Sequence, residues 1–131
     1  MRLRDRIAIV TGAGSGFGEG IATRFAREGA SVVVNDIDVA NGERVAKAIV
    51  AAGGRAKFCA GDVSSDADVS HLVAFALAAY GDLHVVVNNA GTTHRNQPLL
   101  DVAESEFDRI YAVNVKSLFL MARHAVPHFR R

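Results

Sequence analysis

A glycine-rich stretch near the start of the chain has the residue types needed to bind a phosphate. An apolar run leads into Thr-Gly-Ala-Gly-Ser-Gly-Phe-Gly at residues 11–18, and a helical pattern starts at once. Glycines at 12, 16 and 18 would let the backbone turn tightly and approach a pyrophosphate, whose charge would face the free N–H groups of a helix N-terminus. A glycine-rich turn without a ligand is the alternative. The G-x-G-x-x-G spacing is absent because Phe17 replaces its last glycine, and no Lys-Ser or Lys-Thr pair follows, which excludes a nucleotide triphosphatase loop.

A carboxylate follows at the expected end of the second strand. Asp36 could accept hydrogen bonds from both hydroxyls of an adenosine ribose, and its charge would repel a 2′-phosphate. The alternative is a turn aspartate before the second helix, together with Asp38. The two features together predict a dinucleotide site that prefers NAD to NADP.

A polar residue interrupts an apolar stripe in the last third of the chain. Counted from Phe107, positions 110, 111, 114, 118 and 121 share one helical face, and Asn114 is the amide among them. A buried amide needs partners, so we expect it to bond to backbone or water. A partly exposed asparagine at the edge of the stripe is the alternative.

The remaining reactive side chains predict no further site. His124 and His128 have the spacing of a helical metal pair, but Pro127 lies between them and no carboxylate accompanies them. We expect a positive helix end there and no metal site. Cys59 is the only cysteine, so no internal disulfide can form, and we expect it to pack in the core of a protein from a reducing, cytoplasmic setting.

The elements that must position these residues follow a regular rhythm. Four short, mainly apolar runs begin at positions 7, 32, 56 and 85, of which the first, second and fourth are rich in β-branched residues, and the apolar spacing between them is helical. The rhythm predicts βαβ units, and the nearly continuous apolar character of the strands predicts a parallel sheet buried on both faces. We expect Ser64 or Ser65 to cap the third helix, and a fourth helix to run from Asp101 or Ala103 toward Pro127.

Length and composition limit the class of protein. The chain has 131 residues, 50% hydrophobic and 22% charged, which favours one folded domain and excludes wholesale disorder. A formal charge of +1 without a basic patch or acidic tail argues against nucleic acid or a membrane surface as a partner. No apolar run approaches the roughly 20 residues that span a bilayer as a helix.

In these residues the sequence resembles the short-chain dehydrogenase/reductase family, over essentially the whole chain. Five motifs carry the resemblance in the family's order. They are Thr11-Gly12-x-x-x-Gly16-x-Gly18, Asp36, Asp62-Val63, Asn88-Asn89-Ala90-Gly91, and Asn114 within Asn-Val-Lys-Ser.

The resemblance implies a role for each of these residues. The glycine-rich stretch, with Gly12, Ser15, Gly16, Phe17 and Gly18, would line the pyrophosphate. Asp36 would bind the ribose, Asp62 and Val63 the adenine, and Asn89, Ala90 and Gly91 would pass behind the cofactor. Asn114 would be the family's catalytic asparagine, which holds a water.

One departure from the family concerns its proton-transfer residues. The family uses a Tyr-x-x-x-Lys pair, in which the lysine lowers the pKa of the phenol, with an upstream serine. The only tyrosines are Tyr80 and Tyr111, and His84 and Val115 stand four residues later. We therefore expect the chain to be an N-terminal part that lacks the catalytic half, and to be inactive alone.

These observations lead to one main hypothesis. We expect residues 1–131 to form an incomplete, doubly wound Rossmann-type α/β domain, with about four parallel strands in the order 3-2-1-4 and four helices. By resemblance it belongs to an NAD-dependent oxidoreductase that moves hydride between nicotinamide and a secondary alcohol or ketone, such as a sugar or 3-oxoacyl compound. The alternative is an NAD-binding module or pseudoenzyme without chemistry. A homo-oligomer and a complementing C-terminal chain both remain open as assemblies.

Overall fold

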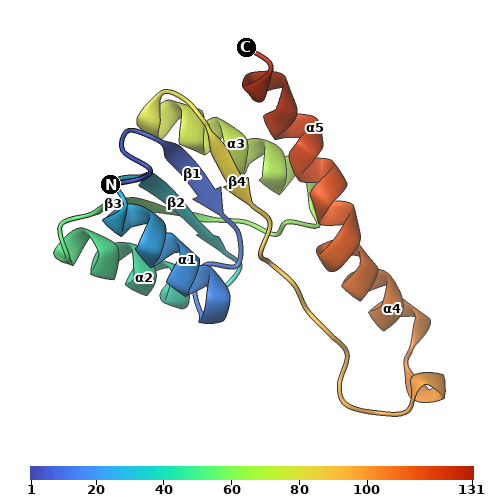
Figure 1. Ribbon diagram of the computed structural model, residues 1–131. Helices are drawn as coiled ribbons and strands as arrows, with labels where there is room; N and C mark the ends of the chain where they lie inside the picture. Colours follow the sequence, from blue (N-terminus) through green and yellow to red (C-terminus); the bar gives the residue numbers. More distant parts are fainter.

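The computed structural model describes all residues, 1–131, and confirms the expected sheet. Its strands are β1 (Ile7–Val10), β2 (Ser31–Asp36), β3 (Arg55–Ala60) and β4 (Val85–Val87). They are all parallel and lie in the order β3-β2-β1-β4 (Figure 1). Val10 is paired with Val34 on one side and Val87 on the other, so β1 and β4 end level with each other and β2 continues to Asp36 at the same edge. The loops that follow them therefore meet at one edge of the sheet.

Helices cover both faces of this sheet. They are α1 (Gly16–Arg27) and α2 (Val39–Ala51) on one face, and α3 (Asp66–Tyr80) and α5 (Ser117–Phe129) on the other (Figure 1). Side chains of a strand alternate between faces, so Ile9 packs in the core beneath α3 and α5, while Val10 packs in the core beneath α1 and α2. The two cores fix the helices, and therefore the loops that connect them to the strands.

Burial differs between central and edge strands. Every residue of β1 is buried, as are the first five of β2, as expected for strands covered on both faces. In β3 only Ala56 and Cys59 are buried, and all of β4 is partly exposed, so the expectation of burial on both faces was wrong for these two strands. They form the two edges of the sheet, where one side of the strand has no neighbour.

Local signals set the ends of the helices. The Ser65 side chain accepts a hydrogen bond from the Asp68 amide and caps α3, and Asp38 caps α2 in the same way through Asn41. Gly81 ends α3 in the left-handed conformation, with φ of 86°, where a side chain would be strained. Of the two serines considered for the third helix, Ser65 is thus the cap.

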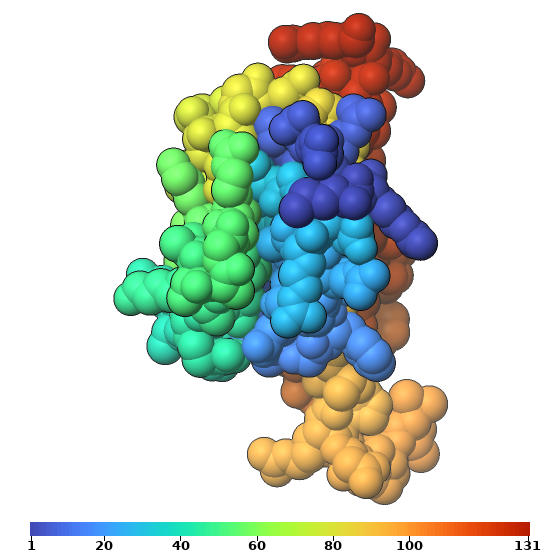
Figure 2. All heavy atoms as spheres, turned by 60° about the vertical axis from the view of Figure 1, so that its left-hand side comes forward, coloured from blue at the N-terminus to red at the C-terminus, as the bar shows by residue number.

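The expected fourth helix is a longer and interrupted rod. After a 3₁₀ turn (Leu99–Asp101) it consists of α4 (Glu104–Tyr111), a π-helical turn (Ala112–Lys116) and α5, which continues past Pro127 to Phe129. The segment between β4 and α4 projects from the body of the molecule, as the orange atoms of Figure 2 show. Pro127 has no N–H and removes one helical hydrogen bond near the end of α5, and the helix continues past it to Phe129.

Only α5 buries side chains in this rod, because neither α4 nor the π turn contains a buried residue. The buried residues of α5 are Ser117, Leu120, Met121 and Ala125, whereas Phe107 and Leu118 are exposed. The stripe expected from a uniform helical period was therefore wrong, apart from Met121.

Candidate functional site

A cleft of about 470 Å³ lies at the carboxyl ends of the strands. It is bounded by the loops after β1, β2, β3 and β4, and by one side of α4. Its lining residues are Gly12, Ser15, Phe17, Asn35, Asp36, Ile37, Gly61, Asp62, Val63, Asn89, Ala90, Gly91, Thr92, Arg109 and Val113. The structure thus brings most of the predicted site residues together. Gly16, Gly18 and Asn114 are not part of the lining.

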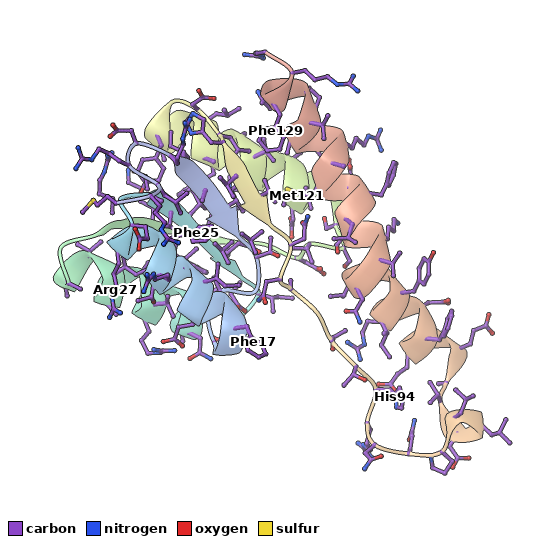
Figure 3. The ribbon with its side chains drawn as sticks, viewed as in Figure 1. Phe17, Phe25, Arg27, His94, Met121 and Phe129 are labelled. Atoms are coloured by element: carbon purple, nitrogen blue, oxygen red, sulfur yellow. The ribbon has the colours of Figure 1, made fainter.

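The glycine-rich stretch forms the loop between β1 and α1. Gly12 has a φ of 60°, and a Cβ there would lie 2.8 Å from the Cα of Ala90, so only glycine suits this position. Gly16 also has a positive φ, of 57°. Ser15 is the N-cap of α1 but its side chain makes no capping hydrogen bond, while Phe17 is exposed at the helix start (Figure 3). A helix leaves its first N–H groups without intrahelical acceptors, so this end of α1 can receive an anion.

The carboxylate of Asp36 faces this loop from the tip of β2. Its Oδ2 accepts a hydrogen bond from the Gly14 amide at 2.8 Å, and its Oδ1 accepts one from the Asp38 amide at 2.9 Å. Two carboxylate oxygens can accept about four hydrogen bonds. Asp36 therefore keeps acceptor capacity for hydroxyl groups in the cleft while it orders the loop.

Asp62 and Val63, which follow β3 after Gly61, lie in a tight turn. Oδ1 of Asp62 accepts hydrogen bonds from the amide of Ser64, at 2.9 Å, and from its hydroxyl, at 2.6 Å. The Asp62 amide donates to Asp68 at the start of α3. Val63 is buried apart from the surface it gives to the cleft. This turn can offer both a flat apolar contact and a carboxylate oxygen to a ligand.

A polar link that the sequence did not predict ties the loops after β1 and β4. Thr11 is 1% exposed; its hydroxyl donates to the Val87 carbonyl and accepts from the amides of Asn89 and Ala90, both at 3.0 Å. In return, Nδ2 of Asn89 donates to the carbonyls of Thr11 and Gly12. The Asn89 side chain is thus committed to the floor of the cleft. A polar residue directly after an apolar strand was the only signal for this link.

Two further residues of the cleft were also missed. Asn35 is 1% exposed, and its Nδ2 donates to the carbonyls of Cys59 and Gly61, which joins the ends of β2 and β3. Arg109 of α4 donates to the Thr92 hydroxyl at 3.1 Å. Since α4 is far from the strands in the sequence, no spacing pattern indicated that Arg109 would line the cleft.

Asn114 lies in the π turn, behind the segment that leaves β4. Its Oδ1 accepts from the Thr92 amide at 2.8 Å, and its Nδ2 donates to the Thr92 carbonyl at 2.7 Å. The expected bond to backbone is therefore present, although Asn114 is exposed and not buried. The amide holds the residue that follows Gly91.

The other titratable candidates lie away from the cleft. Burial raises the pKa of the Tyr80 phenol, and the cations of Arg55 and Lys57 lie over its ring. Nε2 of His124 pairs with Asp66 at 2.8 Å, and no group of three or more His, Cys, Asp or Glu side chains could hold a metal ion. Burial also raises the pKa of the Cys59 thiol. None of the helices is long and apolar enough to cross a membrane.

Comparison with known proteins identifies relatives along the whole chain. The family model of the short chain dehydrogenases matches residues 6–131. The 4-formylbenzenesulfonate dehydrogenase of Comamonas testosteroni is 53% identical over 98% of this chain and 51% of its own length. The 7alpha-hydroxysteroid dehydrogenase of Escherichia coli (strain K12) is 37% identical over 100% of this chain and 51% of its own length.

Solved structures agree with this assignment. The 3-ketoacyl-(acyl-carrier-protein) reductase from Brucella melitensis, complexed with NADH, superimposes with a TM-score of 0.92 at 48% identity, over 98% of this chain and 52% of its own. A metagenomic short-chain oxidoreductase in complex with NADP gives a TM-score of 0.92 at 37% identity, over 98% of this chain and 58% of its own. The chain spans about half the length of the curated relatives it matches. By its fold, its cleft and the family match, the chain belongs to the short chain dehydrogenases.

Proposed function

We propose that the chain binds NAD in the cleft at the carboxyl ends of the strands. The observation that carries this proposal is the pairing of an open helix N-terminus at α1 with the Asp36 carboxylate on the opposite side of the same loop. The first attracts a pyrophosphate and the second binds ribose hydroxyls. The bound cofactor would accept or donate the hydride.

Most of the proposed contacts belong to the lining of the cleft, whereas Gly16, Gly18 and Asn114 are included because of the family resemblance. Gly12, Ser15, Gly16, Phe17 and Gly18 would surround the pyrophosphate. Asp36 would bind the adenosine ribose, Asp62 and Val63 the adenine, and the Asn89–Gly91 backbone would support the cofactor from below. Asn114 would act on the nicotinamide end through Thr92, because its side chain hydrogen-bonds both the amide and the carbonyl of that residue.

The preference for NAD over NADP also rests on Asp36. The two solved relatives hold NADH and NADP, so they support a nicotinamide dinucleotide without distinguishing between the two. A 2′-phosphate would bring negative charge against the carboxylate, and no Lys or Arg lies between Gly12 and Ile21 to offset it. Losing a buried hydrogen bond costs about 1–3 kcal/mol, which corresponds to tenfold or more in affinity.

For the whole protein, we propose reversible oxidation of a small secondary alcohol, or reduction of a ketone or other carbonyl compound. The names of the relatives, which act on a formylbenzenesulfonate, a hydroxysteroid and a 3-ketoacyl group, support this class. Neither Tyr80 nor Tyr111 lines the cleft, and neither has a lysine four residues on. We therefore propose that residues 1–131 alone bind the cofactor without turnover, as a binding module does.

We also propose a cellular location and an assembly for the protein. The single, buried Cys59 supports a reducing, cytoplasmic location. Exposed Phe107, Leu118 and Phe119, together with the free edge of β4, support contact with a second protein segment, in a homo-oligomer or with a complementing C-terminal part.

Calorimetric titration with NADH and NADPH tests the cofactor assignment. We expect NADH to bind at least tenfold more tightly than NADPH. Equal affinities, or tighter binding of NADPH, would refute the role given to Asp36. Absence of binding by either cofactor would refute the proposed function as a whole.

A further inference from the structure

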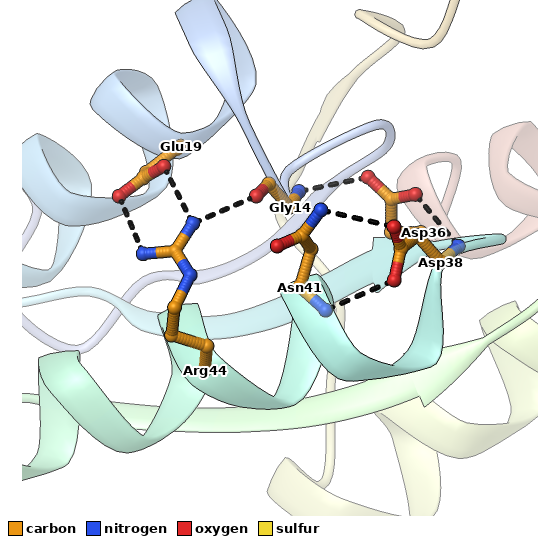
Figure 4. Close-up of polar contacts among 6 residues, drawn as sticks. All are labelled: Gly14, Glu19, Asp36, Asp38, Asn41 and Arg44. Carbon is orange, nitrogen blue, oxygen red and sulfur yellow. Dashed lines mark hydrogen bonds and ion pairs between the residues drawn. The ribbon is translucent and has the colours of Figure 1, made fainter.

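A charged pair lies on the outer side of the glycine-rich loop, outside the lining of the cleft. Arg44 of α2 meets Glu19 of α1 in a two-point contact, with Nη2 at 3.1 Å from Oε1 and Nη1 at 3.3 Å from Oε2. The same Nη2 donates a hydrogen bond to the Gly14 carbonyl at 3.1 Å (Figure 4). One guanidinium therefore joins two helices and the loop between β1 and α1.

The Gly14 residue is held at both of its backbone polar groups. Its amide donates to Oδ2 of Asp36, while its carbonyl accepts from Arg44. A Cβ at this buried glycine would lie 2.7 Å from Oδ2 of Asp36 and 3.1 Å from Cβ of Asn41, so the loop is packed closely as well. The backbone at Gly14 cannot rotate without breaking one of these two hydrogen bonds.

The orientation of this backbone matters for the start of α1. The Gly14 carbonyl belongs to the peptide unit shared with Ser15, which is the N-cap of α1 and lines the cleft. A rotation of that unit would turn Ser15 and redirect the first N–H groups of the helix. Those groups are the ones that can bind an anion.

The charge of Arg44 is balanced by its partner. The hydrogen bond from Arg44 lowers the pKa of Glu19, so the carboxylate is ionised at neutral pH. Because the pair carries no net charge and lies outside the lining, its effect on a ligand comes from geometry and not from direct attraction. A bidentate contact of this kind also fixes the direction of the guanidinium.

We propose that Arg44 is a positioning residue for the cofactor's pyrophosphate. It holds the Gly14–Ser15 peptide so that the N-terminus of α1 faces the cleft, and Glu19 orients the guanidinium that does so. This inference rests on the proposed function, because it assigns Arg44 and Glu19, which lie outside the cleft lining, a role in the same cofactor site.

Ligands that differ in their phosphates test the proposal. NADH and ADP-ribose contain the pyrophosphate, whereas adenosine has no phosphate and would occupy only the end of the cleft near Asp36 and Asp62. In Arg44→Ala we expect the affinities for NADH and ADP-ribose to fall by about tenfold, the effect of one charge-assisted hydrogen bond, with no change for adenosine. Calorimetry measures the affinities for NADH and ADP-ribose, and an NMR titration measures the affinity for adenosine.

Three further variants provide controls. Arg44→Lys keeps one donor for the Gly14 carbonyl but not the fork, so the loss for NADH should be intermediate. Glu19→Gln should weaken NADH less than Arg44→Ala, since the bond to Gly14 remains. Lys47→Ala removes an exposed cation from the same helix with no bond to the loop, and should leave all three affinities unchanged.

The possible results distinguish a failure of the role given to Arg44 from a failure of cofactor binding as a whole. Equal affinities of wild type and Arg44→Ala for ADP-ribose would overturn the inference. An equal loss of affinity for adenosine and for ADP-ribose would overturn it too, because that result indicates general damage to the fold. If Arg44→Ala does not fold, Arg44→Lys decides, and wild-type affinity for ADP-ribose in that variant overturns the proposal. If the wild type binds neither NADH nor ADP-ribose, the proposed function fails, and this inference with it.

Discussion

Helix α1 approaches the loop after β1 so closely that one glycine permits the contact. A Cβ at Gly18 would lie 2.2 Å from the Gly12 carbonyl oxygen and 2.5 Å from Nδ2 of Asn89. The carbonyl oxygen belongs to the backbone and cannot rotate away as a flexible side chain could. Gly20, one residue beyond Glu19 in the same helix, has no atom within 4 Å of such a Cβ. The same substitution at these two positions should therefore have opposite effects.

The magnitudes follow from these distances. In an open helical position, alanine is more favourable than glycine by about 0.5–1 kcal/mol, so Gly20→Ala should be stabilising by that amount. Gly18→Ala gains the same helix propensity but forces α1 away from the loop, and overpacking costs about 1–3 kcal/mol. It also displaces Asn89, whose two hydrogen bonds to the loop contribute about 1 kcal/mol each. We expect Gly18→Ala to lose at least about 2 kcal/mol of unfolding free energy.

Thermal and urea unfolding, followed by circular dichroism, measure this difference. For a chain of this size, 1 kcal/mol corresponds to roughly 3–5 °C, so the two midpoints should differ by about 10 °C. NADH affinity should fall in Gly18→Ala and stay unchanged in Gly20→Ala. Two variants that shift in the same direction and by similar amounts would refute the close approach of α1 to Gly12.

The remaining predictions concern side chains that tie the cleft together. Thr11→Val keeps the shape of the side chain but leaves the part-buried Ala90 amide without its acceptor and the Asn89 amide with the Val87 carbonyl alone, so the free energy of unfolding should fall by about 1–2 kcal/mol in urea titration. Asp36→Ala should bring the affinities for NADH and NADPH together in calorimetry, since both the ribose acceptor and the repulsion of a 2′-phosphate are removed. Glu19→Gln should reduce the acid sensitivity of the melting temperature. The pKa of Glu19 is lowered below its ordinary 4.5, so its contribution to stability is present above pH 4.5 and is lost as the pH falls through the folded-state pKa. Asn114→Ala should accelerate hydrogen exchange at the Thr92 amide, which NMR resolves.

Each of these predictions has a matched control or a contrary outcome. Unchanged stability in Thr11→Val would contradict the hydroxyl bridge between the loops. A persistent preference for NADH in Asp36→Ala would remove that carboxylate from cofactor selection. Glu43→Gln, an exposed carboxylate of α2 without an ion pair, should show the acid sensitivity of the wild type. The amides of β1 provide the internal reference for exchange, and equal rates at Thr92 in both proteins would argue against the Asn114 contact.

Local sequence patterns determined the order and extent of most elements. The four apolar runs lie within β1, β2, β3 and β4, and in β1, β2 and β4 the β-branched residues Val and Ile favour the strand. The helical spacing between the runs gave α1, α2 and α3, and Ser65 was among the expected caps. The positions of Asp36 and the glycine-rich loop at strand ends follow from the same order, since parallel strands end at one edge.

Contacts between distant segments were decided only in three dimensions. The strand order 3-2-1-4 was expected, but the partial exposure of β3 and β4 and the π turn before α5 depend on which neighbours each element packs against. Periodicity describes one element at a time and contains no information about those neighbours. For the same reason the sequence located Asp36 in the site but did not predict that its carboxylate would also bind the Gly14 amide.

The site itself shows this division most clearly. The sequence alone located the glycine-rich loop and Asp36 at the cleft, because glycines and a carboxylate at strand ends can be recognised from spacing, but it did not place Asn35 and Arg109 there. Only the tertiary structure decided what holds them: Thr11 with Asn89, and Arg44 with Gly14, join residues 78 and 30 positions apart in the chain. The strand register and the packing of α2 on the sheet bring these pairs within 3.1 Å of each other. Both are fixed by the packing of the whole domain and not by any one segment.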